Sequence, residues 1–250
     1  MESPRPIPGF LTSLSRTLRV SAAFGSLRVN SAIHRYAAGA WNSADLLAQA
    51  SLVLAKSKTP LAAPQGTIAR ALWEGSVRLL WMAEDPEERI GRIQSSGADG
   101  QLKWIRSPLA RRGRKGFDVP TRSAFAKALR NLRKQAGPRK GSVRAGPLHT
   151  RRVPDLAEQA KALKFRDWYD YVYVPLCGSV HWNSVTLGVE LQSREDSLEM
   201  YLSVSAVHYW VCSMVCCRLL LGHAREFVSI RPRSAEKYLY MGHSVPWDNL

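Results

Sequence analysis

Residues 65–84, QGTIARALWEGSVRLLWMAE, decide the fold class of this chain. Successive residues of a helix are turned by about 100°, and on that wheel the apolar and small side chains of the stretch fill one arc about 140° wide. The arc holds Ala69, Leu72, Trp73, Ser76, Val77 and Leu80. An arc of this width predicts a helix that packs one face against a core.

The segments on either side also favour helices. Residues 10–55 have helical spacing that Gly25 and Gly39 divide into two or three helices. The run Asp85-Pro86-Glu87-Glu88 predicts an N-cap and a further helix to about Gln94, followed by a turn cluster at 95–100. Later helices are expected from Pro154 through Phe165 and over 198–221. Alternating strand patterns are absent, so we predict an all-α helical bundle.

Charge is concentrated in one segment. The 250 residues carry 36 Lys and Arg against 20 acids, and 16 of those basic residues lie between Lys103 and Arg152 with Asp118 as the single acid. The remaining chain is nearly neutral. We therefore predict an extended tail at 1–9 and a single helical domain at 10–250, in which 103–152 is a basic arm or insertion.

A basic arm on a neutral body favours a polyanionic partner, and nucleic acid is the partner we predict. Residues 121–135 are expected to form a short basic amphipathic helix between stretches rich in Gly, Pro and Arg. A solvated loop without a partner is the alternative, and the choice between RNA and DNA stays open. The predicted nucleic-acid-binding residues are Arg111, Arg112, Arg114, Lys115, Arg130, Arg133, Lys134, Arg139 and Lys140.

A second candidate site combines Arg70, Glu74 and His181. Arg70 and Glu74 are four residues apart, so they share a helix face, and they fall at the edge of the apolar arc. The pair is either a structural ion pair or part of a catalytic site with His181 as the general acid or base. The catalytic alternative is a metal-independent nuclease or a defence-type effector.

These motifs carry a family resemblance. The stretch 70–74, RALWE, and the distant stretch 173–182, YVPLCGSVHW, resemble a broad group of uncharacterised all-helical bacterial proteins, often from actinomycetes. That group has an Arg-x-x-x-Glu helix and a distant Tyr/Ser/His element, and it is loosely similar to abortive-infection proteins of the AbiV type. The resemblance implies an all-α fold with Arg70, Glu74 and His181 gathered in one place, and it implies no established reaction. Phage defence is an expectation that follows from the loose similarity to abortive-infection proteins alone. The Ser-Val-His spacing here is one residue tighter than the group's pattern.

The sequence predicts neither a cofactor nor a metal. Phosphate-loop and dinucleotide glycine motifs, Gly-x-Ser-x-Gly and His-Glu-x-x-His are absent. Cysteine and histidine recur at intervals of four, as Cys177/His181 and as His208/Cys212/Cys216. Two such helix faces could bind zinc, but small apolar residues inside a packed helix explain the pattern without a metal.

The run from Met200 to Cys217 contains no Lys, Arg, Asp or Glu. At about 1.5 Å per residue it spans roughly 27 Å, close to a bilayer core, so a membrane-associated or partner-docking protein is a further alternative. We favour a core helix. The four cysteines form no disulfide framework and indicate a reducing, cytoplasmic location. Five Arg and no acid between Ser3 and Ser43 leave a targeting segment as an alternative to a first helix.

Overall fold

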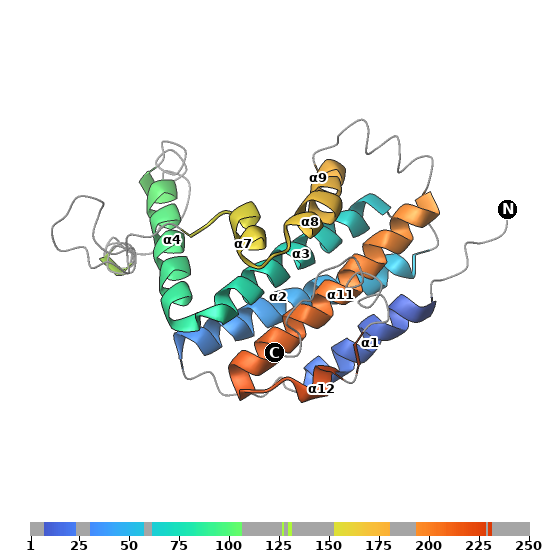
Figure 1. Ribbon diagram of the computed structural model, residues 1–250, viewed down its shortest axis with the longest axis horizontal. Helices are drawn as coiled ribbons and strands as arrows, with labels where there is room; N and C mark the ends of the chain where they lie inside the picture. Colours follow the sequence, from blue (N-terminus) through green and yellow to red (C-terminus); the bar gives the residue numbers. More distant parts are fainter. Residues whose placement is uncertain are drawn as a thin grey trace. The chain divides into compact units, whose positions relative to one another are not determined.

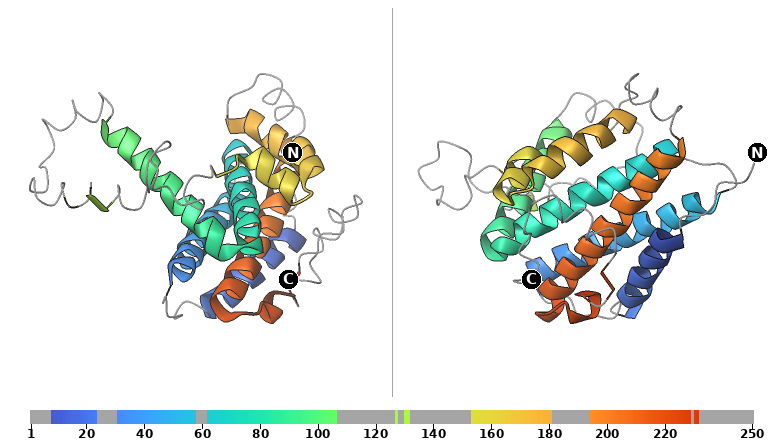
Figure 2. Two further views of the ribbon diagram at one scale, coloured as in Figure 1. Left: turned by 60° about the vertical axis from the view of Figure 1, so that its left-hand side comes forward. Right: turned by 45° about the vertical axis from the view of Figure 1, so that its right-hand side comes forward.

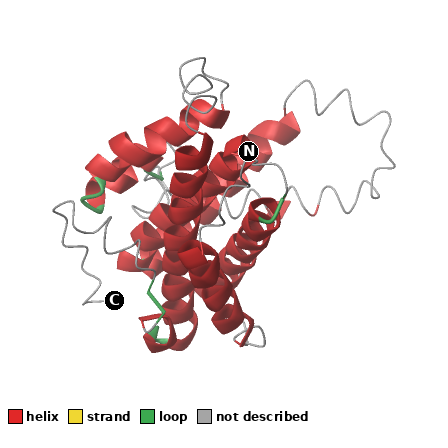
Figure 3. Ribbon diagram, turned by 90° about the vertical axis from the view of Figure 1, so that its right-hand side faces the viewer, coloured by secondary structure: helices red, strands yellow, loops and turns green. Residues whose placement is uncertain are grey.

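The computed structural model of the chain describes residues 8–23, 31–57, 62–106, 153–180 and 194–228, together with positions 127, 130, 131, 230 and 231. Throughout these residues the regular elements are helices, and none of them forms a strand (Figure 3). The predicted all-α class is confirmed.

The chain divides into two compact units. The first consists of Met1–Glu84 and Asp155–Leu250, and the second is Asp85–Pro154. The predicted basic arm, 103–152, lies within the second unit. The candidate residues Arg70 and Glu74 lie within the first.

Three helices of the first unit precede the second unit in the chain. They are α1 (Pro8–Ala23), α2 (Ala32–Ala55) and α3 (Ala62–Glu84) (Figure 1). Helix α2 begins where the Ser31 hydroxyl accepts a hydrogen bond from the backbone N–H of His34 at 3.0 Å, a side-chain N-cap. Small side chains on its buried face let neighbouring helices approach closely. That face holds Ala37, Trp41, Ala44, Ala48 and Ser51.

Helix α11 (Arg194–Leu221) is the centre of the first unit and packs against α1, α2 and α3. Every residue from 201 to 217 is buried, so this helix has no solvent face. It ends at Gly222, whose φ of +80° belongs to the left-handed region and whose N–H donates to the Arg218 carbonyl at 2.7 Å. The short α12 (Arg225–Val228) then folds back, and its Phe227 carbonyl accepts from Trp210 Nε1 at 2.6 Å.

Polar side chains fix the register of α11 against α3. The Gln65 side-chain amide donates to Ser205 Oγ at 3.2 Å and also to Ser51 Oγ of α2. About one turn further along α11, and three turns further along α3, the Ser76 hydroxyl lies 2.7 Å from His208 Nδ1. All five of these side chains are buried. Buried groups that satisfy one another only in a single alignment favour that alignment over its neighbours.

A second polar network joins α11 to α1 and α2. The Tyr209 hydroxyl donates to the Asp45 carboxylate and lies 2.8 Å from Ser21 Oγ. Ser21 also accepts from Trp41 Nε1 at 3.1 Å and lies 3.3 Å from Ser213 Oγ. Burial, followed by the bond to Asp45, raises the pKa of Tyr209, so its hydroxyl stays protonated as a donor.

The chain returns from the second unit in four short elements. They are α7 (Leu156–Ala162), α8 (Arg166–Trp168), the π-helix η1 (Tyr169–Tyr173) and α9 (Val174–Val180). Of these, α7 and α9 make the main contacts with α3. We call residues 155–180 the cover segment. Figures 1 and 2 show it, in yellow and gold, along the side of α3 that faces away from α1.

The prediction of one uninterrupted helix from Pro154 through Phe165 is wrong. Helix α7 ends in a Schellman turn, in which the Lys164 and Phe165 amides donate to the carbonyls of Lys161 at 3.1 Å and Ala160 at 2.7 Å. Lys164 occupies the left-handed position of this turn with φ +61°, where glycine is the usual residue. The sequence gives no glycine to mark the break, which explains the error.

In the second unit, α4 (Pro86–Arg106) starts at the predicted Asp85 cap, whose carboxylate accepts from the Glu88 N–H at 3.3 Å. The predicted turn cluster at 95–100 is wrong, because the helix continues through it to Arg106. Glycine costs a helix only about 1 kcal/mol relative to alanine, too little to end it alone. Of the predicted amphipathic helix at 121–135, the structure describes Lys127, Arg130 and Asn131, which are helical and exposed.

One helix, Ser197–Leu221, is long and apolar enough to cross a membrane among the residues that the structure describes. Within the structure, 78% of its apolar window is buried. Burial of this extent is typical of the central helix of a bundle, the alternative that the sequence favours.

Candidate functional site

Helix α3 places Arg70 and Glu74 at the edge of its buried face, as their position on the helical wheel predicts. Arg70 Nε donates to Glu74 Oε1 at 3.0 Å, and their side chains are 20% and 24% exposed. One turn further, Arg78 Nη2 lies 3.7 Å from Glu74 Oε2, with its side chain more than half exposed. The Glu74 carboxylate therefore has a guanidinium on each oxygen.

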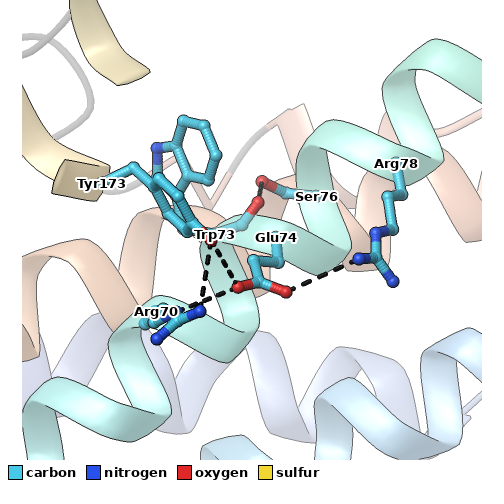
Figure 4. Close-up of polar contacts among 6 residues, drawn as sticks. All are labelled: Arg70, Trp73, Glu74, Ser76, Arg78 and Tyr173. Atoms are coloured by element: carbon cyan, nitrogen blue, oxygen red, sulfur yellow. Dashed lines mark hydrogen bonds and ion pairs between the residues drawn. The ribbon is translucent and has the colours of Figure 1, made fainter. Parts of the chain in front are cut away.

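The third member of the cluster is Tyr173, the last residue of the π-helix. Its hydroxyl donates to Glu74 Oε1 at 2.9 Å and accepts from Arg70 Nη2 at 3.3 Å (Figure 4). Arg70, Glu74 and Tyr173 thus close a three-membered ring of charged and polar contacts. Because α3 and η1 supply different members, the ring ties the cover segment to α3.

Aromatic rings support this cluster from within. The Tyr173 ring stacks on Trp73 with centroids 4.8 Å apart, and Tyr169 lies 5.0 Å from Tyr173. The Arg70 guanidinium lies over the Tyr173 ring at 5.4 Å, within cation–π range. The Trp73 ring is almost fully buried, so the polar cluster sits on an apolar floor.

These surroundings set the protonation states. Burial, and after it the bonds to Glu74 and Cys177, raise the pKa of Tyr173, so its hydroxyl is a neutral donor at neutral pH. Burial acts to lower the pKa of Arg70, but the hydrogen bonds to Glu74 and Tyr173 outweigh it and the pKa rises. The cluster therefore holds a fixed cation and a neutral hydroxyl around one carboxylate. Tyr173 is suited to donating a proton in a hydrogen bond and unsuited to acting as a phenolate nucleophile.

His181, the third predicted catalytic residue, lies outside the described residues, as the first residue after α9. The structure therefore brings Arg70 and Glu74 together and leaves His181 as a prediction. Among the predicted nucleic-acid-binding residues only Arg130 is described, and it is exposed. The others, Arg111, Arg112, Arg114, Lys115, Arg133, Lys134, Arg139 and Lys140, lie outside the described residues.

Within the described part of the chain, no group of three or more His, Cys, Asp and Glu side chains could hold a metal ion. The spacing-based candidates His208, Cys212 and Cys216 are all buried in α11. Burial raises the pKa of Cys212 to about 12, so this thiol is protonated and a poor metal ligand at neutral pH. Cys177 is half-buried on α9.

Sequence reasoning named Tyr173 only as the start of the distant Tyr/Ser/His element and missed its contact with Arg70 and Glu74. It also missed the Ser76–His208 pair. Tyr173 stands 99 residues beyond Glu74 in the chain, so no local spacing connects them. The available signal is the aromatic run Trp168-Tyr169-Asp170-Tyr171-Val172-Tyr173, which marks an element with more aromatic surface than an exposed helix requires. π-Helical turns are frequent at functional sites, and this one presents Tyr173.

The helices and this cluster define an all-α protein with an arginine–glutamate–tyrosine site between a core helix and a shorter covering segment. The chain belongs to a family of unknown function, DUF5677, whose model matches residues 34–198. The matched region runs from α2 into the start of α11 and includes the whole Arg70–Glu74–Tyr173 cluster and the basic segment. Neither the curated proteins nor the solved structures gave a match.

Proposed function

We propose that the protein binds nucleic acid through the basic segment 103–152. The observation that carries this proposal is the charge distribution: 16 of the 36 basic residues and one of the 20 acids lie in this fifth of the chain. The segment belongs to the second unit and not to the unit that contains α11. Such a density of cations offers phosphates a binding surface that the nearly neutral remainder of the chain lacks.

Two helical stretches contribute to the proposed surface. Lys103 and Arg106 lie in the last turn of α4, and Lys127 and Arg130 are exposed helical residues. Each phosphate contact releases counterions from the nucleic acid. Affinity should therefore fall with salt, by a log–log slope of about 0.9 for each contacted phosphate of a duplex.

The test is fluorescence anisotropy with single-stranded RNA and with duplex DNA at about 50 and 200 mM salt. The segment variant carries Gln at Arg111, Arg112, Arg114, Lys115, Arg133, Lys134, Arg139 and Lys140. The matched control loses eight exposed cations elsewhere: Arg16, Arg19, Arg35, Lys56, Lys161, Lys164, Arg225 and Arg231. We expect affinity and salt slope to fall in the segment variant and to persist in the control. Equal losses of affinity in both variants would show that binding depends only on the net charge of the protein, and this result would contradict the proposal.

A second candidate function is a metal-independent nuclease or defence-type effector, and the Arg70–Glu74–Tyr173 cluster is the observation that favours it. Arg70 would stabilise phosphoryl charge, Glu74 would hold Arg70 in place, and His181 would act as the general acid or base. The loose similarity to abortive-infection proteins of the AbiV type belongs to the same proposal. In the anisotropy experiment, a probe that is shortened in the presence of EDTA, and left intact by His181→Ala, would support it. An intact probe with the unaltered protein would contradict it.

A further inference from the structure

The cover segment, residues 155–180, shares one hydrophobic cluster with α3 and α11. The cluster's buried members on α3 include Trp73 and Val77, and α11 adds Tyr201 and Val204. The cover supplies Ala160, Tyr173 and Leu176 as buried members, and most of its other contacting side chains are only partly buried. The segment therefore rests on α3 as an outer layer, while α11 lies inside.

Polar contacts fasten this layer at Tyr173. The Tyr173 hydroxyl lies within hydrogen-bond distance of both Arg70 and Glu74 of α3. The side chains of Arg70 and Glu74 are less than a quarter exposed. Tyr171, two residues before Tyr173 on the cover, is 75% exposed. The outer side of the segment thus faces solvent and its inner side carries the attachment.

The backbone of the cover departs twice from regular helix. Lys164 takes the left-handed position that ends α7, and Tyr169–Tyr173 form a π-helix. A non-glycine residue with φ +61° is strained, and π-helical turns are rare in proteins. A segment with few buried contacts unfolds locally at a lower free-energy cost than the elements of the core. We therefore expect the cover segment to open more readily than α3 or α11.

Beneath the cover lies a buried imidazole. The Ser76 hydroxyl donates its one proton to the Trp73 carbonyl at 2.9 Å, so the 2.7 Å contact with His208 Nδ1 is best made by an Nδ1–H that donates to Ser76 Oγ. This tautomer makes Nε2 an acceptor. Nε2 is buried and makes no hydrogen bond within the described structure. Trp168 of the cover stands edge-on to the imidazole at 5.9 Å, and Trp73 lies at 6.1 Å.

We propose that the cover segment is a pH-sensitive lid, opened by protonation of His208. With the lid closed, a proton on Nε2 would place a charge in a buried aromatic surrounding without a partner, which is strongly unfavourable. Movement of Trp168 away from the imidazole admits water to it. Opening also separates Tyr173 from Arg70 and Glu74 and so exposes the candidate site. The lid does not depend on nucleic-acid binding.

The direction of the pH effect follows from linkage. Burial lowers the pKa of His208 to about 3 in the closed form, and water contact in the open form returns the pKa to its ordinary value of about 6.5. Above about pH 6.5 the imidazole is neutral in both forms, so the free-energy difference that favours the closed form is at its largest. Between about pH 3 and pH 6.5 the open form holds one more proton than the closed form. In that range the ratio of open to closed protein therefore rises about tenfold for each unit by which the pH falls.

Other titratable groups around the lid differ from His208. On α11, Tyr209 and Cys212 have raised pKa values and stay neutral in acid. On α3, Glu74 faces the lid through Tyr173, with Arg70 and Arg78 as its cationic neighbours. The charged residues of the lid in the described chain are all exposed: Asp155, Glu158, Lys161, Lys164, Arg166, Asp167 and Asp170. Glu74 is therefore the group that an experiment must separate from His208.

The experiment is hydrogen exchange by mass spectrometry on the full chain between pH 7.5 and 4.5, expressed as protection factors so that the intrinsic exchange chemistry cancels. Below pH 6.5 we expect protection over 156–180 to fall about tenfold per pH unit, while α1 and α2 keep theirs. His208→Asn should abolish that slope. Glu74→Gln and His223→Asn, a matched change at an exposed histidine, should retain it.

Equal loss of protection in all helices would mean global acid unfolding and would overturn the proposal. A slope that survives in His208→Asn, or that disappears in Glu74→Gln, would assign the response to another group and overturn it as well. If His208→Asn does not fold, Tyr173→Phe provides the test. That variant should lower protection of the lid at every pH by a constant factor and leave the slope unchanged, and a flat profile in the unaltered protein would refute the lid.

Discussion

Helix α11 and the cover segment are two helical regions of one compact unit that differ in how they are packed. Helix α11 is buried on all sides from 201 to 217, and its polar side chains bond to α1, α2 and α3. The cover has one buried side, a polar fastening at Tyr173 and a strained turn at Lys164. A region packed from every direction can open only when the whole unit unfolds, whereas a region attached by one side can open by itself.

The strongest test of this contrast is removal of one large ring from each region. Trp210→Ala on α11 deletes a fully buried indole and its bond to the Phe227 carbonyl, so we expect the free energy of unfolding to fall by about 3–5 kcal/mol. Trp168→Ala, at a half-buried ring of the cover, should cost less than half of that. Urea denaturation followed by circular dichroism measures both. Equal costs would remove the distinction between the two regions.

A smaller effect is expected at the polar fastening. Tyr173→Phe keeps the ring stacked on Trp73 but removes the hydroxyl from Arg70 and Glu74, so we expect a loss of about 0.5–1.5 kcal/mol in the stability of the cover. Hydrogen exchange should locate the loss in residues 155–180. Tyr171→Phe is the control, because that hydroxyl belongs to a side chain 75% exposed. A Tyr173→Phe effect spread evenly over α1, α2 and α11 would argue against a separate cover.

The smallest effect is expected on the outer side of the cover. Arg166 and Asp170 form an ion pair at 3.0 Å with both side chains about half exposed. Exposed pairs of this kind contribute at most about 0.5 kcal/mol, so Arg166→Ala should shift the urea midpoint very little. The guanidinium also lies 5.3 Å over the Tyr169 ring. A loss comparable to that of Tyr173→Phe would show that the cover is fastened on both sides.

Local pattern predicted the parts of the structure that depend on neighbouring residues. The wheel of residues 65–84 placed Trp73 and Val77 in the core and Arg70 and Glu74 at its edge, and the structure confirms all four positions. The i, i+4 geometry of a helix fixes the Arg70–Glu74 contact regardless of the remainder of the fold.

Long-range contacts could not be predicted in the same way. Tyr173 reaches Glu74 across 99 residues, and the π-helix displaces its side chain from the position that α-helical spacing would give it. Two breaks in helical structure were also misjudged. Helix α4 passes through Gly97, because isolated glycines weaken a helix without ending it. Helix α7 stops at Lys164 through a turn for which the sequence carries no glycine signal.

The apolar run of α11 was ambiguous in principle. Length and hydropathy are the same for a core helix and for a membrane span, and periodicity is lost when every side of a helix is buried. Only the packing of α1, α2 and α3 around it distinguishes the two, and that packing is a property of the folded chain.

The central position of α11 also has a consequence for synthesis of the chain on the ribosome. The helices α1, α2 and α3 are complete at Glu84, but the helix they enclose is complete only at Leu221. At a rate of synthesis of about 5–20 residues per second, the apolar faces of the first three helices remain uncovered for on the order of ten seconds before α11 is complete. During that interval they are a target for chaperones, and a chain interrupted before Leu221 should aggregate rather than fold.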